Sequence, residues 1–531
     1  MRELRLVPAA LLVWAIVLAT VVTREAWLGL GLLAVAALSM LKFPGPGLTA
    51  LSLGLAALST SLVRIHTAPA AFPAAVLARI ETSPTMTKTG GWITTLSVDG
   101  ATVRAFLKQQ PPPLGTSVVA QVTSGPADRP GVTPVVLNIS ELEVVAPPRG
   151  FDAWAASVKA DFVVACAKHL GPASEGLLPG MVLGDTSAQS LEEKQLFLDT
   201  GLSHLTAVSG SNITILTVAA VLLAKAVTLG PRYQVGCAAI TLAVFVGLVG
   251  FEPSVLRASV TGIVGLLAVL GSAQAEPAHG LSLAVIALLL YDSDLAVSYG
   301  FALSVAATAG LIALSPLLYR ALARHPLGRR VPDIVLRALA VAIAADLVTM
   351  PLVAAMTGRV VLASIIANVL VAAAVAPVTI LGLLAVLLPA PLEMLLLRLA
   401  EPFTWWIATV ARAVAGMPKL QLGAAWALLF AGWLVWLIHK KWAHYLLAGL
   451  VLAIPEPRAA ETNLESVIQL ETIPKDYRAP PGVQAIIVLE PGKPSKRPHV
   501  TQDGVPILYP NRDGPVRVLR DGTQHAHRGH F

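Results

Sequence analysis

Long apolar runs recur along this chain and constrain its fold more than any other sequence feature. They lie near residues 6–22, 26–41, 48–63, 205–229, 233–250, 254–271, 280–291, 295–318, 336–357, 360–390, 394–413, 424–438 and 442–454. A run of about 20 apolar residues has the length of a helix that crosses a bilayer. With 55% hydrophobic and 13% charged residues, the chain is excluded from the soluble globular class. We predict an all-α polytopic membrane bundle, with membrane lipid as a partner.

Positive charge in the short loops indicates which side of the membrane each loop faces. Cytoplasmic loops retain Lys and Arg, so Arg2, Arg5 and Lys42 predict that three crossings leave the following segment outside. The loop from Arg320 to Arg330 predicts a cytoplasmic connection, and counting back five crossings also places the start of the run at 205–229 outside. Topology therefore explains much of the net charge of +7, which gives no argument for nucleic acid.

Between residues 67 and 149 the apolar runs give way to short alternating segments with charges and prolines. The β-type runs are Trp92–Val98, Thr102–Leu107, Ser117–Val122 and Val135–Ile139. Asp99-Gly100, between the first two, is a strong hairpin signal. We predict a small extracytoplasmic β domain, a five-stranded barrel of the OB type, inserted after three N-terminal transmembrane helices. Its role stays open between structural assembly and ligand contact, because aromatic residues and cations are sparse.

The remaining segments complete the predicted domain organisation. Residues 151–170 carry apolar and polar side chains at helical spacing, which is typical of a helix in the membrane interface. Ser190 and Glu193 form a capping-box pattern. The stretch from Pro455 onward is polar and proline-rich, which predicts a flexible, linker-like tail with little core. The predicted domains are 1–66 (three transmembrane helices), 67–149 (β domain), 150–172 (amphipathic interfacial helix), 173–454 (main transmembrane domain) and 455–531 (tail).

A run of small polar residues from Gly201 to Asn212 opens one of the apolar segments. In lipid such side chains need partners, so we expect them to face a bundle interior or a water-filled cavity. One helix from Thr200 to Thr214 would gather polar residues on a single face. That stripe would comprise Thr200, Ser203, His204, Ser211 and Thr214. The weak helix formers from Ser209 to Asn212 favour a local break, as in segments that line transport paths.

Three ionisable residues in apolar segments are functional candidates, and each also has a simpler interpretation. His204 is either a structural hydrogen-bonding residue or a pore element. Arg257, near the predicted outer end of its helix, either snorkels to the interface or faces the path and attracts phosphate. Asp346 lies in the middle of its segment, where a carboxylate needs a cation or a polar cluster as partner. The full set of candidate path-lining residues is Thr200, Ser203, His204, Ser209, Gly210, Ser211, Asn212, Thr214, Arg257 and Asp346.

Several short motifs follow one another in a specific order. They are Gly184-Asp185, Phe197, Thr200-Gly201, His204 to Gly210 with Asn212, Pro253 to Ala258, Gly300 to Ser304 with Ala306-Ala307, Pro351, Ile366-Ala367-Asn368 and Pro377. Each motif alone is weak, but the ordered set, over roughly 175–390, resembles the competence domain of the ComEC family, the inner-membrane channel for transforming DNA. The N-terminal helices and β region resemble the N-terminal module of that family. The resemblance marks Gly184, Asp185, Gly201, Phe301, Ser304 and Asn368 as structural motif positions.

The chain departs from the family pattern in two respects. Ser211-Asn212 stands where many members have a His after the Ser-Gly pair, so a polar contact is kept and a titrating role is lost. Many members also carry a C-terminal metallo-β-lactamase-like domain, whose opening motif is not found after residue 454. The run from His525 to His530 imitates its metal motif, with Gly529 in place of Asp. We expect no enzymatic activity, no cofactor and no metal.

The resemblance implies a multi-pass channel that passes single-stranded DNA inward. Burying a polyanion in hydrocarbon is prohibitive, so it needs a hydrated path with many hydroxyls and few cations. Implied partners are a DNA receptor outside, a cytosolic ATP-dependent motor, a separate nuclease and further copies of the chain. One alternative is a transporter or translocase of another polar or anionic solute, such as a lipid-linked precursor. The weakest is an enzyme using His204 and Ser209, which would lie about 140° apart on one helix. The tail, like the β domain, is expected outside.

Overall fold

The structure is a computed structural model of the chain. It describes residues 6–87, 91–206, 208, 210–250, 253–270, 276–324, 331–358, 360–361, 363–417, 423–439, 466–474, 477, 479–480, 482–490, 499–501, 505–514, 516–518 and 524–526. The chain divides into two compact units, residues 1–451 and 452–531, and each is described by itself.

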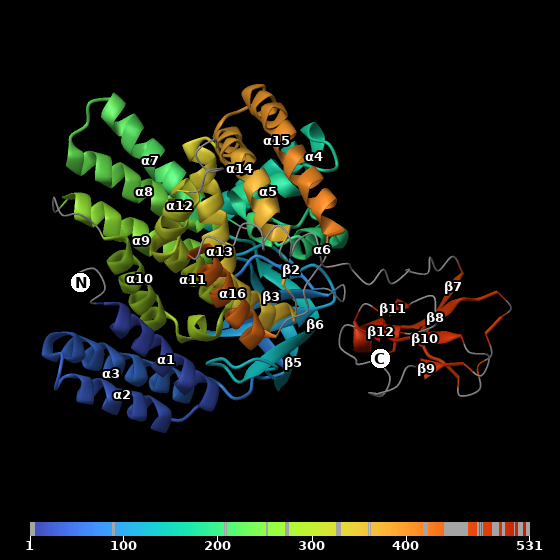
Figure 1. Cartoon of the computed structure of the whole chain (residues 1–531). Coiled ribbons are helices and arrows are strands. Elements are labelled where there is room, and N and C mark those ends of the chain that lie inside the picture. Colours follow the sequence, from blue (N-terminus) through green and yellow to red (C-terminus); the bar gives the residue numbers. More distant parts are fainter. Residues whose placement is uncertain are drawn as a thin grey trace. The chain divides into compact units, whose positions relative to one another are not determined.

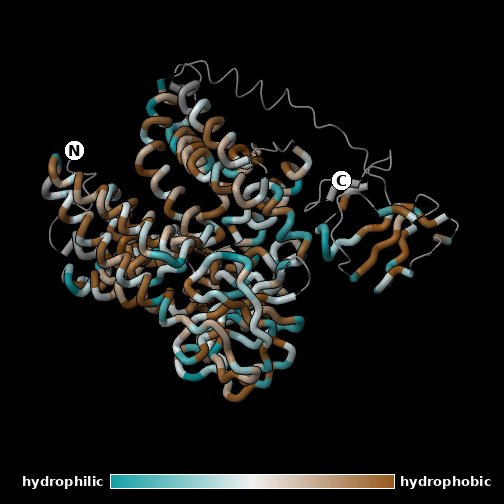
Figure 2. The backbone as a smooth tube through the Cα atoms, turned by 90° about the horizontal axis from the view of Figure 1, so that it is seen from below, coloured by the Kyte–Doolittle hydropathy of each residue, from teal (hydrophilic) through white to brown (hydrophobic). Residues whose placement is uncertain are grey.

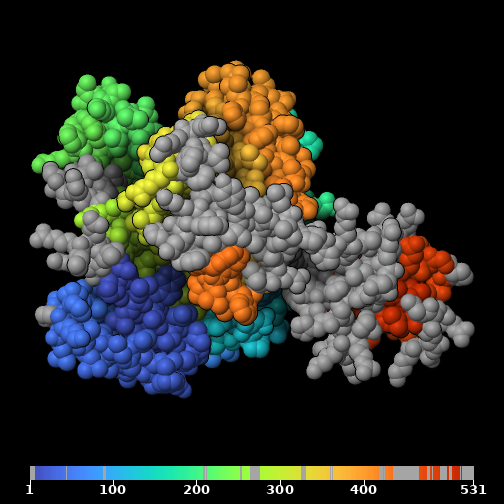
Figure 3. Space-filling model, viewed as in Figure 1, coloured from blue at the N-terminus to red at the C-terminus, as the bar shows by residue number. Residues whose placement is uncertain are grey.

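Three helices open the first unit and confirm the helical character of the first three apolar runs. They are α1 (Val7–Thr23), α2 (Trp27–Ser39) and α3 (Pro44–Thr67). The helices lie side by side, in blue in Figures 1 and 3. A methyl group on Gly54 of α3 would lie 2.8 Å from Leu33 and 2.9 Å from Ile16, so the absence of a side chain allows this close packing.

A closed β-barrel follows, as predicted for this region. Its strands are β1 (Ala75–Ile80), β2 (Thr85–Met86), β3 (Trp92–Val98), β4 (Ala101–Leu107), β5 (Ser117–Pro126) and β6 (Val135–Ala146). The order is β1-β5-β6-β4-β3, a β1–β3 pairing closes the barrel, and β4 and β6 run parallel. Asp99 and Gly100 both have positive φ between paired residues Val98 and Ala101, which confirms the two-residue hairpin. Alternate residues such as Leu96 and Val103 are buried in the barrel.

The β5–β6 loop of the barrel docks on the helices. The backbone N–H of Val132 donates to Asp294 at 2.7 Å, and the guanidinium of Arg24 donates to the Val132 carbonyl. Arg64, in the last turn of α3, donates to the carbonyls of Leu290 and Tyr291, each at 2.7 Å. Hydrogen bonds to Arg24 and Asp294 thus hold the barrel loop, whereas those of Arg64 join α3 to residues 290 and 291; such bonds to charged groups are stronger than neutral ones.

Three helices connect the barrel to the main bundle. They are α4 (Phe151–His169), α5 (Leu177–Leu183) and α6 (Leu191–Asp199). The predicted helix at 151–170 is confirmed as a helix, and its place in the membrane interface stays a prediction. The predicted capping box is also confirmed, because Ser190 and Glu193 exchange hydrogen bonds of 3.1 and 3.0 Å.

The main bundle confirms a mostly helical membrane protein. Its helices are α7 (Gly210–Ala226), α8 (Pro231–Val249), α9 (Pro253–Leu270), α10 (Pro277–Tyr291), α11 (Tyr299–Ala313), α12 (Ser315–Arg324), α13 (Asp333–Thr357), α14 (Ala363–Leu387), α15 (Leu392–Ala415) and α16 (Ala424–His439). Hydrophobic residues line most of them (Figure 2). Pro351 and Pro377 lie inside α13 and α14, which continue through them. The predicted run at 442–454 lies outside the described residues.

Length and composition qualify fewer helices as membrane spans than the apolar runs predict. Among the described residues, four helices pass: Gly45–Thr67, α8, α13 and α14. A fifth span results if α11 and α12, bent by 45°, are taken together. These helices indicate a multi-pass membrane protein. Helices α1 and α2, of 17 and 13 residues, are shorter, so their crossing of the membrane stays a prediction.

The second unit corrects the expectation of a linker-like tail with little core. Its described elements are β7 (Val467–Leu470), β8 (Ala485–Val488), β9 (His499–Val500), β10 (Pro506–Leu508), α18 (Pro510–Asp513), β11 (Val516–Val518) and β12 (Gln524–Ala526). Four strands form a sheet in the order β7-β8-β10-β9. Ile486 and Val488 are buried against Tyr509. The expectation rested on the polar, proline-rich composition of the whole segment. Short apolar strands within it pack against one another and form a small core.

Candidate functional site

The predicted polar segment is broken and does not form one helix. Helix α6 ends at Asp199, Gly201 turns the chain with φ of +72°, a 3-10 turn spans Ser203–Thr206, and α7 starts at Gly210. The expected stripe on a single helical face is therefore wrong. Small polar side chains bond their own backbone here and so compete with helix formation. Thr206 donates to the Ser203 carbonyl at 2.9 Å, for example.

The break favoured by the weak helix formers is real but lies earlier than Ser209 to Asn212. Gly210 and Asn212 belong to the first turn of α7. Ser209 lies outside the described residues, as does the side chain of Ser211. The separation of about 140° between His204 and Ser209 on one helix, which was the argument against the enzyme alternative, no longer applies, because Ser203–Thr206 and α7 are separate elements.

Two of the predicted path-lining residues hold the segment in place instead. Thr200 is fully buried and donates to the carbonyls of Leu196 and Phe197. Asn212 is also buried and donates to the Met181 carbonyl of α5 at 2.7 Å. Their polar atoms are bonded to protein, so neither residue lines a wet path, which corrects the sequence prediction.

Other candidates on the segment are accessible. His204 and Thr214 are exposed, and Ser203 is half-buried. The Nδ1 atom of His204 lies 3.2 Å from the Gly201 carbonyl, and Thr214 donates to the Gly210 carbonyl at 3.0 Å. Each therefore makes a local backbone contact and keeps part of its side chain open.

Hydrogen bonds and close packing at two glycines fix the broken segment among three helices. Ser254 of α9 donates to the Val208 carbonyl at 3.1 Å. A methyl group on Gly180 of α5 would lie 3.0 Å from the Thr206 carbonyl, and one on Gly201 would lie 2.5 Å from Cβ of Ser364 on α14. With the Asn212 bond, the segment is packed between α5, α9 and α14 without room for larger residues.

The first polar cluster lies under the Gly201 turn. Ser364 Oγ lies 3.0 Å from Asp346 Oδ2, and Asn368 Nδ2 lies 3.3 Å from Asp346 Oδ1. Of the two partners expected for Asp346, the structure supplies a polar cluster, and no ion pair involves it in the described part of the chain. Gly201, Asp346 and Asn368 are thus brought together from separate motifs, through Ser364, which sequence reasoning missed. The signal was its spacing of one helical turn before Asn368.

The second polar cluster lies at the start of α7. Arg257 Nε donates to Ser304 Oγ of α11 at 2.6 Å, and a methyl group on Gly210 would lie 3.3 Å from Arg257 Nη2. Arg257 therefore points between helices rather than snorkelling outward, and the structure brings it together with two other predicted positions. Fully buried Phe301 lies one turn before Ser304.

Gly184 and Asp185 form a separate turn. Gly184 ends α5 with φ of +72°, which only glycine adopts freely. The Oδ1 atom of Asp185 accepts the backbone N–H of Ser187 at 2.9 Å. Beside this turn lies Gln189, a buried residue whose side-chain amide has no hydrogen-bond partner within the described structure.

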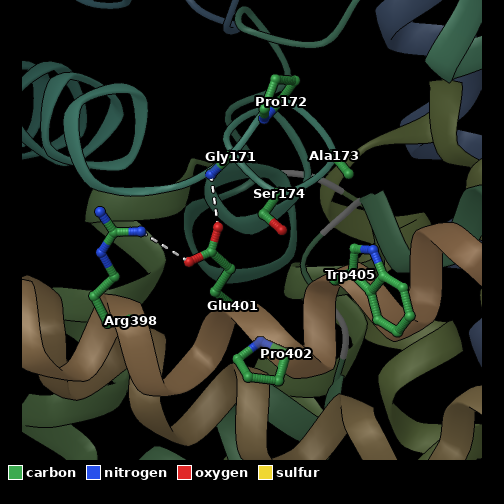
Figure 4. A pocket seen from close by; sticks show the side chains of 8 residues that line it. All are labelled: Gly171, Pro172, Ala173, Ser174, Arg398, Glu401, Pro402 and Trp405. Carbon is green, nitrogen blue, oxygen red and sulfur yellow. Dashed lines mark hydrogen bonds and ion pairs between the residues drawn. The ribbon is translucent and has the colours of Figure 1, made fainter.

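A cavity of about 490 Å³ lies elsewhere, between the α4–α5 connection and α15 (Figure 4). Glu401 accepts from the Gly171 backbone N–H at 2.8 Å and pairs with Arg398 at 3.1 Å. Trp405 and Pro402 form apolar walls. The residues that line it in the described structure include none of the predicted candidates, so we do not assign the site there.

No group of three or more potential metal ligands occurs among the described residues. The side chains from His525 to His530 lie outside them. The residues of the two clusters are mainly hydroxyls, amides and single charges, which suit hydrogen bonding to a polar solute better than metal binding.

Fold and site together define a multi-pass helical membrane protein whose polar residues converge on a broken segment. A comparison with family models matches residues 181–444 to the family described as Competence protein, so these residues are a competence domain of the ComEC family. The matched range contains both polar clusters. Comparisons with curated proteins and with solved structures found no match.

Proposed function

We propose that the chain is a channel that passes single-stranded DNA across the cytoplasmic membrane during natural competence. The observation that carries this proposal is the position of Arg257 beside Gly210. The start of a helix presents free backbone N–H groups and a positive dipole end, and a guanidinium favours phosphate. Both features meet at the first turn of α7, on the segment that carries the family motif.

The charges near this segment suit passage rather than tight binding. Among the described residues, the guanidinium of Arg257 makes one hydrogen bond, through Nε, which leaves its other N–H groups for a phosphate. Exposed His204 and Thr214 with half-buried Ser203 add polar atoms without permanent charge. Conduction requires contacts that are weak and repeated, because many fixed cations would hold the strand.

The surrounding parts have supporting roles in this proposal. The barrel, of the OB type by its strand order and parallel β4–β6 pair, acts as an extracytoplasmic assembly domain, since its β5–β6 loop is occupied by Arg24 and Asp294. The second unit also lies outside. A DNA receptor, a cytosolic ATP-dependent motor, a separate nuclease and further copies of the chain complete the system.

A transporter or translocase of another polar or anionic solute is the second candidate. The same arginine and helix start would recognise the phosphate of a lipid-linked precursor. The two candidates differ in what cells lose without the chain: DNA entry in one case, and a process unrelated to DNA in the other.

Transformation of cells that carry single variants tests the proposal. In a strain that lacks the chromosomal gene, Arg257→Ala should lower transformation about tenfold or more relative to the restored wild type, since a hydrogen bond to a charged group contributes about 1.5–3 kcal/mol. Arg257→Lys should restore part of it. Arg232→Ala, which removes an exposed arginine at the start of α8, is the matched control.

His204→Ala extends the same experiment along the path. The amount of each variant in the membrane is measured by immunoblot, and DNA bound at the cell surface is measured separately. Normal transformation by both Arg257→Ala and His204→Ala would contradict the assignment of these residues to the path. Normal transformation by the deletion strain would contradict the channel itself and favour the transporter.

A further inference from the structure

The cluster of Asp346, Ser364 and Asn368 has a feature that a structural role does not explain. Ser364 Oγ lies 2.7 Å from the Val361 carbonyl oxygen and 3.0 Å from Asp346 Oδ2. A hydroxyl group carries one proton, and a carbonyl oxygen carries none. Two acceptors therefore face a single donor if Asp346 is ionised.

The distances indicate how the proton of Ser364 is used. The shorter contact, to the Val361 carbonyl, has the usual O–H···O length, so the hydroxyl proton lies there. The contact with Asp346 then needs a proton from the carboxyl group. Asn368 does not replace it, because its Nδ2 lies 3.3 and 3.5 Å from the two carboxyl oxygens, longer than an ordinary N–H···O bond.

Charged groups on the neighbouring elements do not neutralise an ionised Asp346. Helix α14 carries no ionisable side chain. The ionisable side chains on the elements packed against α13 and α14 are Tyr299 on α11, Tyr319, Arg320 and Arg324 on α12, Asp333 and Arg337 on α13 itself, Glu393, Arg398, Glu401 and Arg412 on α15, and His204 in the turn above; the side chain of His439 on α16 lies outside the described residues. Arg337 pairs with Asp333 at 2.7 Å, and Tyr319 also donates to Asp333. No ion pair reaches Asp346 from any residue that the structure describes.

We propose that Asp346, Ser364 and Asn368 form a proton-binding site within the bundle. The neutral carboxyl group of Asp346 donates to Ser364 Oγ, and Ser364 donates to the Val361 carbonyl. When the proton leaves to water, the carboxylate becomes an acceptor, and the Ser364 hydroxyl must turn from Val361 toward Asp346. No other bond forms or breaks.

The proton site is coupled to the family motif by direct packing. A methyl group on Gly201 would lie 2.5 Å from Ser364 Cβ and 3.5 Å from its Oγ, so the Gly201 turn rests on the side chain that changes its hydrogen bond. The proton site therefore adjoins the turn between α6 and α7. This inference goes beyond the proposed function, because it holds whichever solute the protein passes.

Infrared difference spectroscopy of the purified full chain in lipid nanodiscs tests the proposal. In mildly acidic buffer the wild type should show a C=O stretching band of a protonated carboxyl group that is absent from Asp346→Asn. Asp333→Asn, which removes an exposed carboxylate at the start of the same helix, is the matched control and should keep the band. Loss of the band in alkaline buffer should also occur only in proteins that retain Asp346.

Ser364→Ala provides a second measurement that does not depend on removing the carboxyl group. The protonated carboxyl then loses its acceptor, so the band should remain and shift to higher wavenumber. The proposal is overturned if the wild type and Asp346→Asn have the same carboxyl region in mildly acidic buffer, or if Ser364→Ala leaves the band unshifted. Neither readout contains DNA, so failure of the channel proposal would leave this result intact.

Discussion

Replacing Gly201 by alanine should destabilise the protein through two separable effects. The residue has φ of +72°, where a side chain costs about 1–2 kcal/mol. Its new methyl group would lie 2.5 Å from Ser364 Cβ, and overpacking of this kind costs about 1–3 kcal/mol. Gly201→Ala should therefore lower the free energy of unfolding by about 2–5 kcal/mol.

Gly358→Ala separates the two effects. Gly358 also has positive φ, +69°, but beyond its chain neighbours no atom of the described residues lies within 4 Å of its missing side chain, so only the backbone cost of about 1–2 kcal/mol applies. Unfolding of the detergent-solubilised chain in increasing denaturant measures both. Adding Ser364→Gly to Gly201→Ala removes the Cβ atom that the new methyl group would meet. A double-mutant cycle should therefore show that part of the lost free energy of unfolding is recovered. The reasoning is refuted if Gly201→Ala costs no more than Gly358→Ala.

Two further substitutions test contacts around the site and the barrel. Asn212→Ala removes the buried hydrogen bond to the Met181 carbonyl and should lower the free energy of unfolding by about 1–3 kcal/mol. Thr214→Ala, at an exposed position of the same helix, should change it by no more than about 0.5 kcal/mol. Equal effects in the same unfolding assay would contradict the anchoring role of Asn212. Burial and then the nearby charge of Asp294 raise the pKa of Asp292, next to the loop that holds the barrel. A carboxyl group whose pKa is higher in the folded than in the unfolded chain stabilises the fold at pH values below its unfolded pKa. This stabilisation is lost as the pH rises through the folded pKa. Asp292→Asn should therefore gain stability relative to the wild type as pH rises, and a difference in Tm that does not vary with pH would contradict this.

Features that depend on local sequence were predictable. Apolar runs predicted the positions of most helices, because a bilayer or a helical core demands them whatever the neighbours are. Asp99-Gly100 predicted the hairpin, and Ser190 with Glu193 predicted the helix start, since each signal is complete within four residues.

Features that depend on distant contacts were not predictable from one sequence. The break after Thr200 requires Gly201 to rest on Ser364, which is more than 160 residues away. Periodicity alone predicts a continuous helix there, and it also fails to show that Thr200 is buried. The sequence predicted only that Asp346 would have a cation or a polar cluster as its partner. The residue itself was not predictable, because the hydroxyl group belongs to Ser364 on the next helix. In the second unit, strands of two to four residues are too short for a periodic signal.

Passage of DNA through the purified chain in liposomes tests the central claim most directly. Labelled single-stranded DNA is added outside vesicles that contain the wild type, Arg257→Ala or no protein, and external nuclease then removes what has not entered. We predict nuclease-resistant single-stranded label in wild-type vesicles, with much less in the Arg257→Ala vesicles and none above background in empty ones. Label that remains as nuclease-sensitive with the wild type as in empty vesicles would contradict the account.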